Sequence, residues 1–193
     1  AGAMQTPGCV LIAGTGSICY GKNAAGEHFR CGGGGHIIDD PGSGYALGRD
    51  ALAAALQTED GRLSENALHG AVMDTVGGSG IQGIFDFVYF SRRGKGDIAA
   101  LAPLVLRCAA QGDAVSIDIL RRGAAALARL VSAVMGKLGL ENGSPCALAG
   151  GLLAEDNVYR RAVCAAVAPF CRPAAPEHDA LFGAVQLALA AIQ

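Results

Sequence analysis

Residues 10–48 read VLIAGTGSICYGKNAAGEHFRCGGGGHIIDDPGSGYALG, and the prediction of the fold starts from this stretch. An apolar run stops at Gly14-Thr15-Gly16-Ser17, and a second run ends in four glycines, Gly32–Gly35. Because glycine has no Cβ atom, such loops let backbone N–H groups come close to a ligand. Loops of this kind hold phosphates and polar small molecules. The stretch therefore predicts a binding site built from loops at strand ends.

Short apolar runs predict the strands. Three lie near the start, over residues 9–13, 17–22 and 27–31, and a hairpin turn joins the last two. A later run, Cys146–Ala149, predicts a buried strand that leads into Gly150-Gly151. Strands come first and helices dominate the middle, which indicates one continuous α/β domain.

The rest of the chain is predicted to be mainly helical. Helices are expected from Tyr45, from Ser64 as N-cap to about Met73, and over Asp97–Ala110. The run Ile81–Phe90 fits a helix or a strand.

A long helix is predicted after Asp113, its N-cap. Its apolar face has the 3.6-residue period and consists of Leu120, Leu127, Val131, Val134 and Leu138. The next helix is marked by Tyr159, Val163, Val167 and Phe170, and the last by Leu181, Val185, Ala188, Leu189 and Ile192.

Composition excludes several classes of function. The chain of 193 residues carries 15 Lys and Arg against 17 Asp and Glu, whereas a nucleic-acid surface needs a basic excess. No apolar stretch reaches the roughly 18 residues of a membrane span. The seven cysteines contain no C-x-x-C pair, which favours reduced thiols packed as small apolar residues in the cytoplasm. Cys31, in the glycine-rich stretch, is a candidate reactive thiol or half of a local bridge.

Each motif taken alone leaves alternatives open. Gly14–Ser17 fits a phosphate loop or a tight hairpin. It is not a P-loop, because no G-K-[ST] follows. It is not a dinucleotide-binding fingerprint either, because the next predicted element is a strand and not a helix. On a strand, Asp39 and Asp40 would point to opposite faces, so one at most would face a site, where it could accept from sugar hydroxyls. The alternative is an Asx-type turn before Pro41. Gly150-Gly151 could accommodate a flat ring or form a plain turn.

The order of these motifs is more specific than any one of them. GTGS at a strand end is followed by G-G-x-G-H, D-x-G-S-G-Y-x-x-G, A-x-Q-G-D before a long helix, and a strand ending in GG. This order resembles the C-terminal lobe of the BadF/BadG/BcrA/BcrD ATPase family, in its N-acetylglucosamine kinase branch. These proteins belong to the sugar kinase, Hsp70 and actin superfamily, in which ATP lies between two lobes. The resemblance implies an α/β, ribonuclease H-like lobe of the actin-like ATPase fold, with a mixed sheet, hairpin strands first and helices on the faces.

The resemblance assigns site residues position by position. Gly14, Thr15 and Gly16 would form the second phosphate loop, with Thr15 reaching the phosphates of ATP, and Ala109, Gly150 and Gly151 would flank the adenosine. The implied cofactors are ATP and Mg²⁺. Sugar-binding residues would be Ser17, Gly33, Gly34, Gly35 and Asp40, the last one accepting from hydroxyls. No catalytic residue and no protein metal ligand is expected within the chain.

The sequence departs from the family pattern at three positions in or beside the predicted sugar site. The family's G-D-E-G-S is Asp39-Asp40-Pro41-Gly42-Ser43 here, so aspartate replaces glycine and proline replaces glutamate. An aromatic residue often found within G-G-x-G is Gly34, so stacking on the sugar would be lost. These departures bear on which sugar is bound.

The implied function is that of the C-terminal lobe of an ATP-dependent kinase that phosphorylates an amino sugar such as N-acetylglucosamine or glucosamine. The alternatives are the ATPase lobe of a 2-hydroxyacyl-CoA dehydratase or benzoyl-CoA reductase activator, whose cysteines hold an iron–sulfur cluster, and a non-catalytic sugar-sensing domain. A cytoplasmic homodimer with no nucleic-acid or membrane partner is expected.

The family's N-terminal lobe carries a D-G-G-x-T phosphate loop and the aspartate that acts as general base, and neither motif is in this sequence. Ala1–Gln5 looks like the tail of a helix, as if residues 1–193 were one lobe. Phosphoryl transfer needs the base within reach of the hydroxyl and the phosphates held from both sides. The chain alone is therefore predicted to be inactive.

Overall fold

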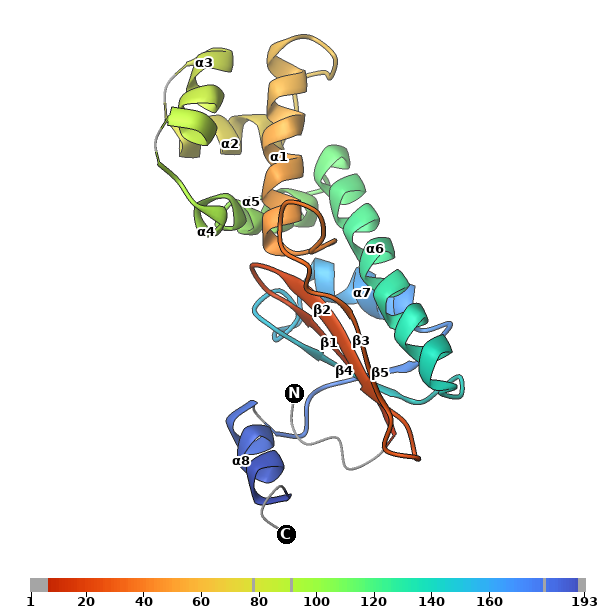
Figure 1. Ribbon diagram of the computed structural model, residues 1–193. Helices are drawn as coiled ribbons and strands as arrows, with labels where there is room; N and C mark the ends of the chain where they lie inside the picture. Colours follow the sequence, from red (N-terminus) through yellow and green to blue (C-terminus); the bar gives the residue numbers. More distant parts are fainter. Residues whose placement is uncertain (1–6, 78, 91, 179, 191–193) are drawn as a thin grey trace.

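A five-stranded mixed sheet forms the centre of the computed structural model, which describes residues 7–77, 79–90, 92–178 and 180–190. The strands are β1 (Gly8–Ala13), β2 (Ser17–Lys22), β3 (His28–Gly32), β4 (Pro145–Ala149) and β5 (Arg172–Ala174), in the order β3-β2-β1-β4-β5 (Figure 1). β1, β2 and β3 pair antiparallel, whereas β1 pairs with β4 and β4 with β5 in parallel. The predicted mixed sheet with hairpin strands first is confirmed.

The central strand β1 has a partner on each side, which explains its nearly unbroken apolar sequence. It is joined to β2 by a tight turn in which the N–H of Gly14 donates to the carbonyl of Gly16 over 2.9 Å. The parallel strand β4 ends beside the end of β1, with Ile12 opposite Ala149. The turns that follow β1 and β4 therefore meet at one edge of the sheet.

Two helices cover one face of the sheet (Figure 1). α6 (Ala114–Leu138) packs against β1, β2 and β3, and α7 (Val158–Val167) packs against α6. As predicted, Asp113 caps α6: its carboxylate accepts from the N–H of Ser116 over 2.8 Å. The buried side of α6 has the expected helical spacing and includes Ile119, Leu120, Leu127, Val131 and Val134.

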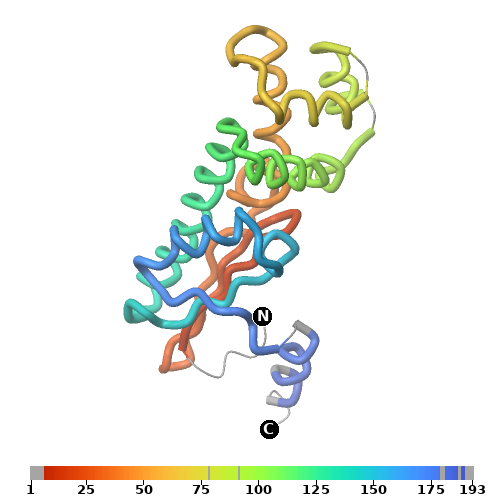
Figure 2. Tube along the Cα trace, turned by 180° about the vertical axis from the view of Figure 1, so that it is seen from behind, coloured from red at the N-terminus to blue at the C-terminus, as the bar shows by residue number. Residues whose placement is uncertain are grey.

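A group of shorter helices stands above the strand ends that carry the loops (Figures 1 and 2). It comprises α1 (Gly44–Glu59), α2 (Ala67–Val76), α3 (Gly80–Phe85), the π-helical turn η1 (Asp86–Phe90), α4 (Lys95–Ala99) and α5 (Ala102–Ala110). α1 and α4 lie so close that a Cβ atom on Gly48 would overlap the carbonyl oxygen of Ile98. Glycine at that position thus fixes how near α4 comes to the loops below.

The structure corrects several predicted boundaries. α2 starts after Asn66, whose side chain accepts from the N–H of His69 over 2.9 Å, and not at Ser64. The single helix predicted over Asp97–Ala110 is two helices, because the second begins anew with Pro103 in its first turn, where proline is tolerated. Ile81–Phe90 is helical. β5 was not predicted, because three residues carry too little periodicity to be recognised.

α8 (Ala180–Ala190) stands apart from the sheet (Figure 1), and several of its apolar side chains are exposed: Leu181, Phe182, Val185 and Leu189. Ile192, predicted to belong to it, and Ala1–Gln5 lie outside the described residues. Among the described residues no single helix is long and apolar enough to cross a membrane; only Lys95–Ala110 and Ala114–Leu138 together, bent by 118°, meet that requirement.

Four of the seven cysteines, dispersed in the sequence, lie in neighbouring strands of the sheet. Cys9 lies opposite Cys146 on neighbouring strands, and Cys19 lies opposite Cys31. All seven are free thiols, and only Cys31 and Cys164 are half-exposed. The prediction that most of them pack as small apolar residues is confirmed, and Cys31 forms no bridge.

Candidate functional site

The loop after β1 is held by the N-terminus of α1. The N–H of Gly44 donates to the carbonyl of Gly14 over 2.7 Å, and the N–H of Tyr45 donates to that of Thr15 over 3.2 Å. Ser43 caps the helix, its hydroxyl accepting from Ala46 over 3.2 Å. The Thr15 side chain is left exposed, close to the positive end of the helix dipole, where an anion is favoured. Residues 14–17 thus form a tight hairpin turn, and their contact with phosphates stays a prediction.

The turn after β4 packs against the end of β1. Gly150 has φ +91°, and a Cβ atom there would overlap the backbone of Ala13. The N–H of Leu152 donates to the Ala13 carbonyl over 3.1 Å. A Cβ atom on Gly14 would lie 4.0 Å from the Gly151 nitrogen, so these two turns are neighbours. The structure therefore brings the predicted phosphate loop and the predicted Gly-Gly pair together.

A cavity of about 340 Å³ lies between these turns and the helices above them. Its walls include Gly14, Thr15 and Gly151 and, from α4 and the start of α5, Gly96, Ala99 and Pro103. The helical wall is small and apolar, while the loops provide backbone polar groups, and this division suits a ligand with a flat ring and an anionic tail.

Ala109 is not part of this cavity. It lies at the far end of α5 and is 9% exposed, packed in the core. The contribution of α4 and α5 to the wall of this cavity was not predicted from the sequence. The signal was present, because Gly44 and Gly48 are four residues apart on one face of α1 and so allow a second helix close by.

Asp40 joins the predicted phosphate loop to the glycine-rich stretch. Its Oδ1 accepts from the N–H of Ser17 over 3.0 Å, and its side chain is nearly buried. A Cβ atom on Gly16 would lie 3.0 Å from both carboxylate oxygens, so only glycine lets the carboxylate come this close. Asp40 has φ +55°, which sets it in a loop and not on a strand. The expectation that Asp39 and Asp40 alternate across a strand is therefore wrong.

Two hydrogen bonds fix the segment that follows Asp40. The Ser17 hydroxyl donates to the carbonyl of Pro41 over 2.7 Å, and the Tyr159 hydroxyl, from α7, donates to that of Gly42 over 2.6 Å. Burial raises the pKa of Tyr159 above its ordinary value of 10.0, so the phenol remains a donor. Ser17 is buried, and its predicted contact with a sugar stays a prediction. In the sequence Tyr159 looked like a core residue of a helix, and nothing pointed to its anchoring role.

The glycine-rich loop closes on itself. The N–H of Gly34 donates to Oδ2 of Asp39 over 2.8 Å, and the N–H of Asp39 donates to the carbonyl of Gly35 over 2.8 Å. The N–H of Gly33 donates to the carbonyl of Ser17 over 2.9 Å, which ties the loop to β2. Gly33 and Gly35 have φ +74° and +94°, so both positions need glycine. Neither aspartate side chain forms the local turn considered before Pro41.

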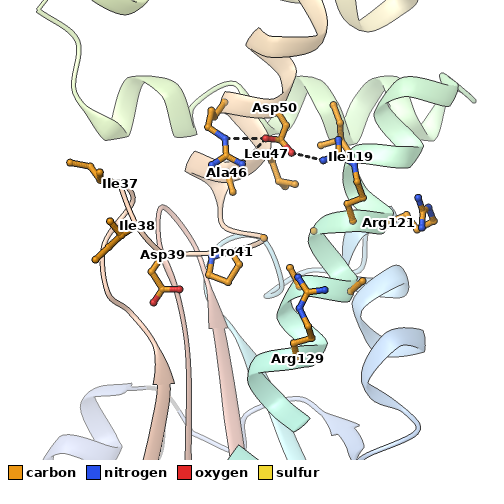
Figure 3. A pocket seen from close by; sticks show the side chains of 16 residues that line it. Ile37, Ile38, Asp39, Pro41, Ala46, Leu47, Asp50, Ile119, Arg121 and Arg129 are labelled. Carbon is orange, nitrogen blue, oxygen red and sulfur yellow. Dashed lines mark hydrogen bonds and ion pairs between the residues drawn. The ribbon is translucent and has the colours of Figure 1, made fainter. Parts of the chain in front are cut away.

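A larger cavity of about 650 Å³ lies behind Pro41, between this loop and α6 (Figure 3). Ile37 and Ile38 stand at its edge, 84% and 86% exposed. Its far wall carries arginines: Arg122 pairs with Asp50 over 3.0 Å and Arg129 points toward Pro41 (Figure 3). It was not predicted, because its two walls come from segments about 80 residues apart.

The comparisons with known proteins agree with this geometry. The model of the BadF/BadG/BcrA/BcrD ATPase family matches residues 1–188. The chain is 39% identical over 141 residues to the N-acetylmuramic acid/N-acetylglucosamine kinase of Clostridium acetobutylicum, covering 73% of the chain and 46% of that protein. It is 32% identical over 159 residues to the N-acetyl-D-glucosamine kinase of Dictyostelium discoideum, covering 81% of the chain and 48% of that protein. The chain thus spans about half the length of these curated relatives.

Solved structures give the same result for the fold. A putative N-acetylglucosamine kinase from Chromobacterium violaceum is similar with a TM-score of 0.73 and 31% identity, over 94% of this chain and 59% of that one. A second, from Porphyromonas gingivalis, has a TM-score of 0.70 at 18% identity, over the same shares, and supports the fold alone. The expected mixed α/β architecture of the actin-like ATPase fold is confirmed, and the chain belongs to the BadF/BadG/BcrA/BcrD ATPase family.

Proposed function

We propose that this chain is the C-terminal lobe of an ATP-dependent kinase that transfers the γ-phosphoryl group to a hydroxyl of an amino sugar such as N-acetylglucosamine or glucosamine. The observation that carries the proposal is the contact between the Asp40 carboxylate and residues 16–17 of the phosphate loop. An acceptor for hydroxyl groups thereby lies beside a loop suited to phosphates, and a phosphotransferase must bring these two ligands together.

The nucleotide would occupy the 340 Å³ cavity. Gly14, Thr15 and Gly16 would bind the phosphates and their Mg²⁺, which neutralises charge that develops during transfer. Gly150 and Gly151, with the small residues of α4 and α5, would lie against the adenosine. Ala109 would not contact the adenosine. Packed in the core, it would help to position α5, whose first turn lines the cavity.

The sugar would lie on the other side of Asp40. One carboxylate oxygen is engaged with the N–H of Ser17, and this bond orients the group for the sugar hydroxyls. Gly33, Gly34 and Gly35 would contribute backbone groups, and Ser17 would support the site from below through its bond to Pro41.

We propose further that the isolated chain is inactive. It spans about half the length of its curated relatives, and a general base and a second set of phosphate contacts would come from the remainder of such a protein. Residues 1–193 would then form one lobe. A cytoplasmic homodimer assembled through this lobe remains part of the proposal, and light scattering of the complete gene product tests its assembly.

The kinase test measures ADP release by the complete gene product with N-acetylglucosamine and with glucosamine. Asp40→Asn keeps an oxygen for the Ser17 N–H and removes the charge, so we expect sugar affinity to fall about 10-fold to 100-fold while ATP affinity stays within about twofold. The matched control is Asp50→Asn, since Asp50 pairs with Arg49 and Arg122 and not with the loops. ATP turnover that no amino sugar stimulates would contradict the proposal.

No observation favours the activator alternative. The curated relatives carry kinase names. The thiols of Cys9, Cys19 and Cys146 are buried inside the sheet, where they could not be shared between subunits. Among the described residues no group of three His, Cys, Asp or Glu side chains is placed to hold a metal ion.

A further inference from the structure

The bond between Gly34 and Asp39 joins the two positions at which the glycine-rich loop departs from the family pattern. Asp39 stands where the pattern has glycine, and Gly34 stands where it often has an aromatic residue. In the structure the Asp39 carboxylate accepts from the Gly34 N–H over 2.8 Å. The two departures are therefore in direct contact.

The contact leaves no room for a side chain at residue 34. A Cβ atom on Gly34 would lie 2.9 Å from Oδ2 and 3.0 Å from Cβ of Asp39, distances that real Cβ atoms rarely show. A side chain at 34 would require Asp39 to leave. An aromatic residue at 34 and the present position of the Asp39 carboxylate thus compete for one place, and the bond between Gly34 and Asp39 would be lost.

The Asp39 arrangement also changes the charge of the loop. A half-buried carboxylate takes the place of an uncharged ring, one residue from the nearly buried carboxylate of Asp40. The cations facing this loop lie on the far wall of the larger cavity, beyond Pro41. Arg49 and Arg122 are paired there with Asp50, and Arg121 is paired with Asp118 over 2.6 Å. Arg129 also lines that wall, on the α6 side of Pro41 (Figure 3).

We propose that Asp39 is a specificity-determining residue of the sugar site, which selects neutral and cationic amino sugars and rejects sugars that carry a carboxylate. This inference rests on the proposed function. N-acetylglucosamine is neutral, glucosamine carries an ammonium group near pH 7, and N-acetylmuramic acid carries a lactyl carboxylate. The last is named as a substrate of the Clostridium acetobutylicum relative, so the proposal separates this chain from that protein. A second anion within a few ångströms of a carboxylate disfavours binding by about tenfold.

The test compares the three sugars as substrates of the complete gene product and of its Asp39→Asn variant. Asparagine keeps an oxygen for the Gly34 N–H and removes the charge. We expect the variant to gain about tenfold in kcat/KM for N-acetylmuramic acid, to lose several-fold for glucosamine, and to change less than about threefold for N-acetylglucosamine. Opposite changes for the anionic and cationic sugars distinguish a charge effect from a general loss of activity.

Lys137→Gln is the matched control, because it removes an exposed charge from the C-terminal end of α6, outside the larger cavity, and should leave all three ratios unchanged. Equal use of N-acetylmuramic acid and N-acetylglucosamine by the unmodified protein would overturn the inference and leave the proposed kinase intact. Activity on none of the three sugars would overturn the proposed function itself.

A second measurement tests the exclusion directly. Gly34→Trp alone should lower the melting temperature and raise the KM for N-acetylglucosamine, because the ring and Asp39 compete for one place. Gly34→Trp combined with Asp39→Gly should recover both. Additive effects of the two substitutions would show that the positions are independent and would overturn the inference.

Discussion

The predicted phosphate loop and the glycine-rich loop are both turns at the same end of one sheet, yet they are held in different ways. Gly14–Gly16 is fixed from outside, by the N-terminus of α1 and by the turn after β4. Residues 34–39 are fixed mainly from inside, by a side chain of the loop itself. A loop held by two separate elements can change little without disturbing both of them. A loop closed by its own side chain can change shape and charge while its surroundings stay the same.

The strongest way to break the externally held loop is Gly150→Ala. The residue has φ +91°, and its Cβ atom would overlap Ala13, so β1 and β4 must move apart. We expect a loss of about 2–5 kcal/mol in the free energy of unfolding, measured with urea. Gly151→Ala is the control: it meets no atom within 4 Å and should change stability by less than about 0.5 kcal/mol. Equal losses would show that the close approach at Gly150 is not what holds the turn.

Tyr159→Phe removes the hydrogen bond by which α7 anchors the segment after Asp40. It leaves the Gly42 carbonyl buried without its donor, at a cost of about 1–3 kcal/mol. Because that segment positions Asp40, the KM for the sugar should rise more than the KM for ATP in the complete gene product. Tyr89→Phe, at a tyrosine that is 71% exposed, should change neither. A larger rise in the KM for ATP would mean that the Tyr159 hydrogen bond supports the predicted phosphate loop and not the sugar site.

Thr15→Ala tests whether the predicted phosphate loop binds ATP through the Thr15 hydroxyl. The side chain is exposed, so the free energy of unfolding should stay within about 0.5 kcal/mol. If its hydroxyl binds a phosphate, the KM for ATP should rise about tenfold, as expected for a hydrogen bond to a charged group. Thr15→Ser, which keeps the hydroxyl, should restore most of the affinity. An unchanged KM for ATP would remove Thr15 from the site.

Alkaline pH gives the smallest effect. Burial raises the pKa of Tyr159 above the 10.0 of an unfolded chain, so its contribution to stability is complete below pH 10 and is lost as the pH rises further. Each pH unit above that value should remove up to about 1.4 kcal/mol. Urea midpoints between pH 9 and 11 should fall less steeply in Tyr159→Phe than in the unmodified chain. Parallel curves would mean that the phenol is not protected.

Much of the fold was predictable because it depends on local pattern. The apolar runs of β1 and β4, the cap at Asp113 and the spacing along α6 were visible in the sequence. The break between α4 and α5 was not, because helical periodicity continues across it while Pro103 restarts the helix. β5 was missed because three residues show no period.

The candidate site was predictable in its residues and less so in its bonds. Glycine content and the position of Asp40 pointed to loops that the structure brings together at one edge of the sheet. The partner of Asp40 could not be foreseen, because the bond to Ser17 depends on φ +55° at Asp40 and on the missing Cβ atom of Gly16. The Gly34–Asp39 bond and the Tyr159 anchor likewise depend on tertiary placement, since Tyr159 meets a carbonyl 117 residues away in the sequence.

The cysteines gathered in the sheet give the molecule its own set of labelling sites. Cys9, Cys19, Cys146 and Cys171 are at most 2% exposed, whereas Cys31 and Cys164 are partly accessible. A thiol reagent should therefore modify the last two in the folded state and the other four only when the strands separate. Mass spectrometry of timed alkylation would then record how often the sheet opens, and adding ATP or sugar would show which ligand slows that opening, without a single substitution.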